Sequence, residues 1–295
     1  MSIYKVISFY KYVTIDDPEN FANEHLNFCQ NLGLKGKIYI ASEGINGSVF
    51  GKDEILKEYK SNLTSNSLFA DIYFKETETN KVAFNKMHVR VKNEIVNSGL
   101  FNTDLKNTAP KLPPEQLLKF YEDKKEFIIV DARNWYESKI GRFKNAITPK
   151  ITHFREWPKV AESLQAYKNK TIITYCTGGI RCEKASAYLR EQGFKDVYQI
   201  DGGILSFIQK FPDTYWEGGM FLFDDRKVYE PNTKEELRHI SNCYFCNKPT
   251  SYYINCHNID CDKIIVCCHD CKIENDYCCS EECRKSNNRR QTNYG

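Results

Sequence analysis

The sequence lacks both a long apolar stretch and a strong excess of one charge. No apolar run approaches the about 20 residues that a membrane-spanning helix needs. The formal net charge of the 295-residue chain is only +3, which is too small to indicate nucleic-acid binding by itself. The chain has 41% hydrophobic residues, which is typical of a folded protein with two or three domains and excludes a disordered or fibrous one.

A secretory signal is also missing from the N-terminal sequence MSIYKVISFYKYVTIDD. Its lysines and tyrosines are scattered among the apolar residues, so there are no separate basic and apolar regions. This pattern predicts a cytoplasmic protein without a membrane partner. In such a protein, thirteen cysteines indicate metal sites and reactive thiols more than disulfides.

Cysteine is scarce in most of the chain and abundant at its end. Only Cys29, Cys176 and Cys182 precede residue 240, whereas ten cysteines lie between Cys243 and Cys283. Eight of these ten form closely spaced pairs of the kind that chelate a metal ion. The four pairs are Cys243 with Cys246, Cys256 with Cys261, Cys268 with Cys271, and Cys279 with Cys283.

Eight thiolates in four pairs suit two tetrahedral zinc sites within a cysteine-rich segment at residues 240–285. The zinc would be structural, because so short a segment buries too small a core to fold alone. The spacing leaves open which pairs share a metal, and first with third and second with fourth is one option. Disulfides remain the alternative. Four residues are then spare or possible substitutes: Cys267, Cys278, His257 and His269.

The first 98 residues alternate short strand-like runs with two amphipathic stretches. The order predicts a ferredoxin-like βαββαβ domain. Strands are expected in YKVISFYKYV, on both sides of a turn at EGING, in FADIYF and in KMHVRVKNEIV. Helices are expected in PENFANEHLNFCQNLG and KDEILKEYKSNL. Residues 99–114 are rich in Pro, Asn and Thr and are predicted to be a linker.

Residues 115–226 show a different alternation, in which apolar runs are separated by helical segments. FIIVDA, TIITYC and DVYQI are buried-strand patterns, and EKASAYLREQG is a helix ended by Gly193. Such a pattern predicts a parallel α/β sheet, whose reactive groups gather at the carboxyl ends of its strands. Cys176 lies at one of these ends.

The loop CTGGIR follows that strand and precedes the helix expected to begin near Cys182. Gly178 and Gly179 allow successive amides to turn inward as an anion cradle, and the helix start adds positive potential. Together with the charge of Arg181, these features favour a thiolate at Cys176. The other interpretation is that Cys176 is a buried small hydrophobic residue.

Four residues separate Cys176 from Arg181, namely Thr177, Gly178, Gly179 and Ile180, and this loop resembles that of the rhodaneses. Cysteine phosphatases have five residues there, and so a wider cradle. VDARNWYESKIGRFKNAI and DGGILSF resemble other rhodanese segments. We expect Asp131, Arg133 and Glu137 to hold the fold together through ion pairs and caps.

The whole chain resembles a more specific family. SEGINGSVFG, FNKMHVRVKNEIVNSG, YCTGGIRCEKAS and WEGGMFLFDDR, together with the cysteine-rich tail, are similar to the oxygen-dependent tRNA uridine hydroxylases. These rhodanese-containing proteins install 5-hydroxyuridine at the tRNA wobble position. The resemblance implies an oxidoreductase that acts on tRNA with dioxygen as co-substrate and has Cys176 as its active-site cysteine. We expect Arg181 of the same loop to be catalytic with it, and we infer no obligate protein partner.

The sequence shows no flavin motif and no recognisable iron site in the rhodanese-like part. One mechanism that fits the residues has Cys176 add to C6 of uracil, which makes C5 nucleophilic toward dioxygen. Arg181 and the loop amides would stabilise the enolate oxygen. Cys182 could resolve a sulfur adduct on Cys176, although packing is the expected role.

Basic residues in the first domain give a possible RNA contact. Lys35, Lys37, His88, Arg90 and Lys92 lie on or beside expected strands, where they could meet phosphates or simply face solvent. EGING is either part of this surface or only a tight Asn-Gly turn. Two other functions stay open: a sulfurtransferase that uses a Cys176 persulfide, and a non-catalytic zinc- and RNA-binding protein.

Overall fold

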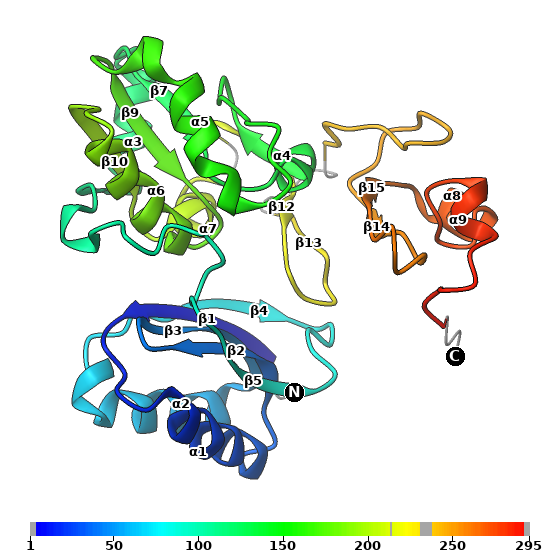
Figure 1. Ribbon diagram of the computed structural model, residues 1–295, viewed down its shortest axis with the longest axis horizontal. Helices are drawn as coiled ribbons and strands as arrows, with labels where there is room; N and C mark the ends of the chain where they lie inside the picture. Colours follow the sequence, from blue (N-terminus) through cyan, green and yellow to red (C-terminus); the bar gives the residue numbers. More distant parts are fainter. Residues whose placement is uncertain (1–3, 213, 231–237, 292–295) are drawn as a thin grey trace.

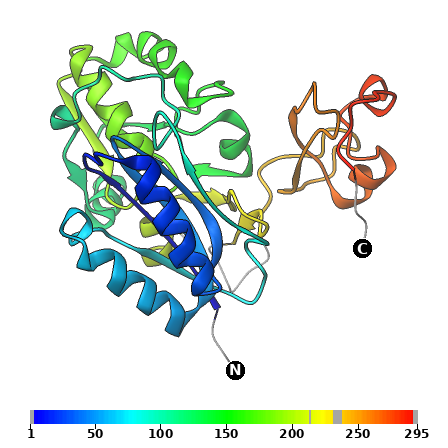
Figure 2. The same ribbon diagram turned by 60° about the horizontal axis from the view of Figure 1, so that its bottom comes forward.

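The computed structural model describes residues 4–212, 214–230 and 238–291, and the chain forms three parts (Figure 1). An N-terminal α/β domain packs beneath a central α/β domain, and a small C-terminal unit lies to one side. Figure 2 shows the same separation of the C-terminal unit from the other two parts in a second view. Among the described residues, no helix has the length and apolar character needed to cross a membrane.

The N-terminal domain is a five-stranded sheet with two helices on one face. Its strands lie in the order β4-β1-β3-β2-β5, and β5 runs parallel to β2. The predicted ferredoxin-like βαββαβ order is confirmed in the first six elements, and β5 extends the sheet. The elements are β1 (Tyr4–Tyr12), α1 (Pro18–Asn31), β2 (Lys35–Ala41), β3 (Gly44–Lys52), α2 (Asp53–Ser65), β4 (Lys75–Thr79) and β5 (Met87–Val91).

The two faces of this sheet have different partners. Side chains alternate along a strand, so Ile7 and Phe9 of β1 enter the core under the helices while Tyr10 and Tyr12 point to the other face. That second face meets the central domain, where Tyr12 donates a hydrogen bond to the Ile180 carbonyl at 3.4 Å. The sheet is therefore both the core of one domain and a docking surface for the next.

Two local predictions in this domain are wrong. FADIYF is not a strand, because Phe69 and Ile72 pack into the core from a short 3₁₀ turn and the strand begins only at Lys75. The EGING segment is not the hairpin turn. The turn is at Ser42 and Glu43, and the Asn-Gly pair lies inside β3, where Asn46 donates to the Ile95 carbonyl at 2.8 Å.

The central domain confirms the predicted parallel α/β sheet, with strand order β6-β10-β9-β7. Its strands and helices are β6 (Lys111–Leu112), α3 (Pro114–Glu122), β7 (Ile128–Asp131), α4 (Trp135–Ile140), β8 (Gly141–Phe143), α5 (Trp157–Ser163), β9 (Thr171–Tyr175), α6 (Ile180–Glu191), β10 (Asp196–Ile200) and α7 (Gly203–Lys210). The segment expected to be only a linker contributes β6. The start of α6 is at Ile180 and not near Cys182, because left-handed Gly179 ends the loop.

The last part of the chain begins with short strands against the central domain and ends in the cysteine-rich unit. Its elements are β11 (Trp216–Gly218), β12 (Met220–Phe221), β13 (Val228–Tyr229), β14 (Tyr253–Asn255), β15 (Ile264–Val266), α8 (His269–Glu274) and α9 (Glu281–Arg284). Tyr253 stacks on Phe221 with 4.4 Å between ring centroids, and Val266 packs against Ile140. The unit is thus anchored to the central domain by apolar contacts.

Candidate active site and metal-binding clusters

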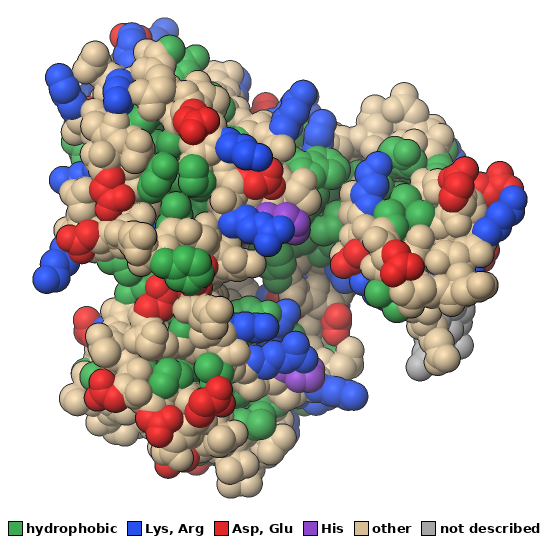
Figure 3. Space-filling model, viewed as in Figure 1, with side chains coloured by type: hydrophobic (Ala, Val, Ile, Leu, Met, Phe, Trp, Pro, Cys, Tyr) green, Lys and Arg blue, Asp and Glu red, His purple; other side chains and the backbone are tan. Residues whose placement is uncertain are grey.

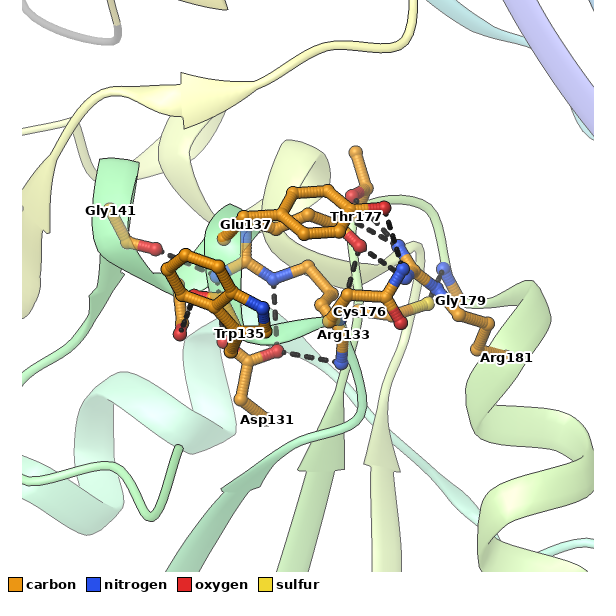
Figure 4. Close-up of polar contacts among 12 residues, drawn as sticks. Asp131, Arg133, Trp135, Glu137, Gly141, Cys176, Thr177, Gly179 and Arg181 are labelled. Carbon is orange, nitrogen blue, oxygen red and sulfur yellow. Dashed lines mark hydrogen bonds and ion pairs between the residues drawn. The ribbon is translucent and has the colours of Figure 1, made fainter. Parts of the chain in front are cut away.

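The loop around Cys176 lies at the carboxyl end of β9, as the parallel sheet predicts (Figure 4). The loop is fixed by the start of α7, because the amide of Ile204 donates to the Cys176 carbonyl at 2.9 Å and that of Leu205 to the Thr177 carbonyl at 3.1 Å. The glycine pair at the start of α7, Gly202 and Gly203, permits this approach. A side chain at Gly203 would lie 2.5 Å from the Cys176 carbonyl oxygen, and its φ of +69° also disfavours other residues.

Cys176 is fully buried, yet its surroundings favour the thiolate. The amide of Gly179 donates to the sulfur at 3.1 Å. Burial alone would raise the pKa of the thiol, but a hydrogen bond with Cys182, the charge of Arg181 and nearby amides lower that pKa to about 6. The interpretation of Cys176 as only a packed hydrophobic residue does not account for this set of donors.

Arg181 is held in place by Glu137 of α4. Its two terminal nitrogens bind the two carboxylate oxygens at 2.5 and 2.8 Å, and the pair is almost completely buried. The backbone amide of Asn134 also donates to Glu137, at 3.1 Å, which orients the carboxylate. Glu137 therefore acts as the expected ion pair and cap, and through them it fixes the guanidinium beside the loop.

Asp131 and Arg133 form a second buried ion pair at the end of β7. Arg133 binds both carboxylate oxygens of Asp131, at 2.9 and 2.7 Å, and donates to the Gly141 carbonyl at 2.7 Å. Figure 4 shows this pair beneath the Cys176 loop, with its polar atoms directed at each other and at Gly141. These contacts fit the predicted structural role.

Cys182 lies in the first turn of α6 with its side chain in the core beside Cys176. Burial and the neighbouring sulfur raise the pKa of Cys182 well above its ordinary value, so it stays a thiol near neutral pH. A protonated thiol can donate a hydrogen bond to the Cys176 sulfur, and it is a poor nucleophile. This position agrees with the packing role.

The N-terminal domain covers the loop, which local sequence patterns did not indicate. The hydroxyl of Tyr10 donates to Glu183 of α6 at 2.9 Å. Lys184, also on α6, binds Glu43 at 2.8 Å and Glu94 at 2.7 Å. These partners are far apart in sequence, so the spacing of residues along the chain gave no signal of the contact.

All three parts of the molecule line a pocket of about 360 Å³ beside this site, a size that suits a small organic group. The side chains of Lys37 and His88 enter it from β2 and β5, and Tyr136 from α4. Phe223 contributes a ring that is 60% exposed and lies 5.8 Å from the Arg181 guanidinium carbon. The residues of the Cys176 loop do not line the pocket, which is connected to Arg181 through the ring of Phe223, and Asp224 and Asp225 also line it.

The candidate RNA-binding residues gather on the β2–β5 edge next to this pocket. Lys37 pairs with His88 and Tyr39 with Arg90 across the two strands, and Lys37 and Lys92 both lie over the Tyr39 ring. Lys35 is on the same face but half-buried. Figure 3 shows basic and histidine side chains gathered where the N-terminal and central domains meet.

The eight paired tail cysteines form two clusters, each able to hold a metal ion. One cluster joins the first and third pairs, Cys243, Cys246, Cys268 and Cys271, and the other joins the second and fourth, Cys256, Cys261, Cys279 and Cys283. Within each, all sulfurs lie within 4.8 Å of one another. The sulfurs of Cys246 and Cys268 are 3.7 Å apart, and those of Cys261 and Cys279 are 3.6 Å apart. Four sulfurs bound to one zinc ion at about 2.3 Å would lie about 3.8 Å from one another, so these distances suit a tetrahedral site.

The other cysteines and the tail histidines lie outside these clusters. Cys267 and Cys278 are buried in the core of the unit, and neither cluster includes His257 or His269. All thirteen cysteines are within the described residues and none forms a disulfide. The structure therefore contains free thiols in the tail and not the disulfides that the sequence had left as an alternative.

Comparison with known proteins agrees with these three parts. Residues 4–95 match the UPF0176 acylphosphatase like domain, residues 113–210 the Rhodanese-like domain and residues 217–284 the Rhodanase C-terminal family. A solved rhodanese-like domain from Anabaena is 21% identical, with a TM-score of 0.32 over 37% of this chain and 79% of that one.

Curated relatives match nearly the full chain. The tRNA uridine(34) hydroxylase of Bacillus licheniformis is 42% identical over 289 residues, which is 95% of this chain and 88% of the relative. That of Aster yellows witches'-broom phytoplasma is 41% identical over 96% of this chain and 92% of the relative. The chain belongs to the tRNA uridine(34) hydroxylase family. The resemblance noted in the sequence is thereby confirmed. In this protein the rhodanese-like loop retains both its cysteine, Cys176, and its arginine, Arg181.

Proposed function

We propose that this protein hydroxylates the wobble uridine of tRNA to 5-hydroxyuridine, with Cys176 as the reactive thiol and dioxygen as the oxidant. The observation that carries the proposal is an intact, charge-stabilised cysteine loop in a chain that matches tRNA uridine(34) hydroxylases over almost its whole length. An enzyme acting on tRNA would work in the cytoplasm, and the proposal requires no obligate protein partner.

The pocket and the basic edge beside the loop support a tRNA substrate. An extruded base needs an aromatic partner, and Phe223 presents an exposed ring next to Arg181. The phosphates on either side of that base would meet Lys37, His88 and Arg90 on the β2–β5 edge. Cys176 itself is fully buried under the N-terminal domain, so the base reaches it only if side chains at this interface move.

In the proposed chemistry, the Cys176 sulfur adds to C6 of uracil and the electron pair moves to the O4 enolate. C5 then reacts with dioxygen. Overall, one dioxygen, two electrons from a two-electron reductant and two protons convert C5–H to C5–OH and release one water. Loss of the C5 proton and of the sulfur restores the ring. Arg181, held by Glu137, and the loop amides supply positive potential for the enolate.

The tail clusters would each bind one structural zinc ion, for a total of two. The donor set supports this, because four thiolates at tetrahedral spacing are a preferred zinc environment. The metal would hold β14, β15 and the two short helices together and would take no part in hydroxylation. That role is consistent with the place of the clusters, which lie in the C-terminal unit and not in the domain that carries Cys176 (Figure 1).

A sulfurtransferase is the second candidate, because the same amides that stabilise a thiolate would stabilise a Cys176 persulfide. Mass spectrometry of tRNA nucleosides separates the two functions. In cells that lack this protein, the wild-type chain should restore 5-hydroxyuridine and Cys176→Ser should leave it at background. Cys29→Ser, which alters a buried thiol in the N-terminal core, is the matched control and should restore it. Unchanged 5-hydroxyuridine with Cys176→Ser refutes the assignment, and loss of a thiolated nucleoside instead favours sulfur transfer.

A further inference from the structure

Lys75 at the start of β4 is a buried lysine with no carboxylate partner. Its side chain is 7% exposed, and the free energy of burying an unpaired ammonium is unfavourable. The other deeply buried lysine, Lys184, is 2% exposed and binds Glu43 and Glu94. Within the described part of the chain, by contrast, the Lys75 ammonium forms no ion pair and no hydrogen bond. The ammonium instead faces the rings of Tyr10 and Tyr73, at 5.2 and 5.3 Å from their centroids, and such cation–π contacts offset only part of the cost of burying a charge.

The position of Lys75 is set by the two segments that build the Cys176 site. Its Cε lies 3.3 Å from where a Cβ on Gly202 would be, so the lysine chain packs on the turn that supports the loop. Its ammonium lies 5.2 Å from the centroid of the Tyr10 ring. The Tyr10 hydroxyl in turn lies 2.9 Å from where a Cβ on Gly179 would be. Lys75 is therefore a buried cation of the N-terminal domain that packs against the turn beside the rhodanese-like loop.

Lys75 and Cys176 lie on either side of the Gly202–Gly203 turn, and Cys176, Asp201 and Glu183 are the nearby groups whose negative charge favours the charged form of Lys75. Burial lowers the pKa of Lys75 to about 8, and the Cys176 thiolate is the strongest of the charges that oppose this. With a pKa of about 6 for Cys176, both groups are ionised between about pH 6 and pH 8. The other titratable or charged groups around the two sites are Tyr10, Tyr12, Tyr73, Lys111, Arg181, Cys182, Glu183 and Asp201.

We propose that Lys75 is a positioning residue of the thiol site, which stabilises negative charge on the Cys176 sulfur from across the domain interface. The N-terminal domain then completes the reactive centre as well as covering it. The inference rests on the proposed function only in taking Cys176 as the reactive thiol. It predicts that removing the ammonium changes the ionisation of Cys176 without loosening the fold, because an apolar side chain fills the same buried space at lower cost.

The test is the pH dependence of Cys176 alkylation in the full-length protein, followed with iodoacetamide and mass spectrometry of the peptide that carries it. The midpoint of the profile reports ionisation whether or not access changes. In Lys75→Met, the midpoint should move to higher pH, so that alkylation below the midpoint falls about tenfold if the midpoint rises from pH 6 to pH 7. Lys75→Arg should restore the wild-type midpoint. Lys81→Met, which removes an exposed lysine just after β4, should leave it unchanged.

Thermal unfolding separates this role from a structural one. Lys75→Met should unfold at the same temperature as the wild type or at a higher one, and Lys75→Gln provides a second neutral variant if Met folds poorly. An unchanged midpoint in a folded neutral variant overturns the inference. Because alkylation does not involve tRNA, that result leaves the proposed hydroxylation untouched. Conversely, 5-hydroxyuridine made by Cys176→Ser would refute the function and leave the Lys75 result standing.

Discussion

The rhodanese-like loop and the cysteine-rich tail use the same side chain in opposite ways. Cys176 is a single sulfur surrounded by amides, an arginine and a neighbouring thiol, and it has no second thiolate to share a metal with. Each tail cluster instead brings four sulfurs within 4.8 Å of one another, where their negative charges repel unless a cation lies between them. Both kinds of cysteine are buried in large part, so the proposed roles of nucleophile and metal ligand rest on the groups around each sulfur and not on burial.

The largest expected effect is the loss of a tail ligand. Cys268→Ser should lower bound zinc by one ion per chain and unfold the C-terminal unit, because zinc binding contributes most of the folding free energy of such units. Metal analysis by mass spectrometry and limited proteolysis measure both. Cys267→Ser is the matched control, since the neighbouring sulfur is buried but lies outside the cluster. Equal zinc content in the two variants would show that the cluster does not bind the metal.

Breaking the ion pair behind the loop should have the next largest effect. Glu137→Gln leaves the Arg181 guanidinium buried without its counter-charge, which costs about 3–5 kcal/mol in the free energy of unfolding. Chemical denaturation measures this, with Glu162→Gln on the exposed side of α5 as the control. A loss no larger than that of the control would mean that Glu137 does not hold Arg181 in solution.

Sequence predicted the residues within these two sites, but not the contacts that the N-terminal domain makes with the loop. The CTGGIR loop and the four cysteine pairs are local patterns, so their residues could be predicted from spacing, whereas the spacing left open which pairs share a cluster. Tyr10 and Lys75 were not, because β1 and β4 reach the loop only through the packing of one domain on another. Local apolar runs also misplaced one strand, since Phe69 and Ile72 enter the core from a turn. Contacts between distant segments leave no periodic signal.

The stability of the protein should depend on pH through Cys176. A pKa of about 6 in the folded protein, against 9.0 for an ordinary cysteine, means that the unfolded chain binds one more proton between these values. The contribution of the Cys176 thiolate to the free energy of unfolding is therefore largest above about pH 9. It decreases as the pH falls and disappears below about pH 6. The difference in unfolding free energy between wild type and Cys176→Ser should increase from pH 6 to pH 9. A difference independent of pH would mean that the folded thiol is not ionised.

The smallest expected effect is that of Cys182→Ala. This substitution tests the role of the thiol that lies beside the Cys176 sulfur. The substitution removes a buried sulfur, at a cost of about 1–2 kcal/mol, and a hydrogen bond to the Cys176 sulfur, so the alkylation midpoint of Cys176 should rise. Because Cys182 stays protonated near neutral pH, 5-hydroxyuridine in tRNA should fall only a few-fold. Complete loss of the nucleoside in a stably folded variant would instead assign Cys182 to resolving a sulfur adduct. Cys176 and Cys182 would then react as a pair. The loop and the tail would differ in how their cysteines are arranged, and not in whether a cysteine has another sulfur beside it.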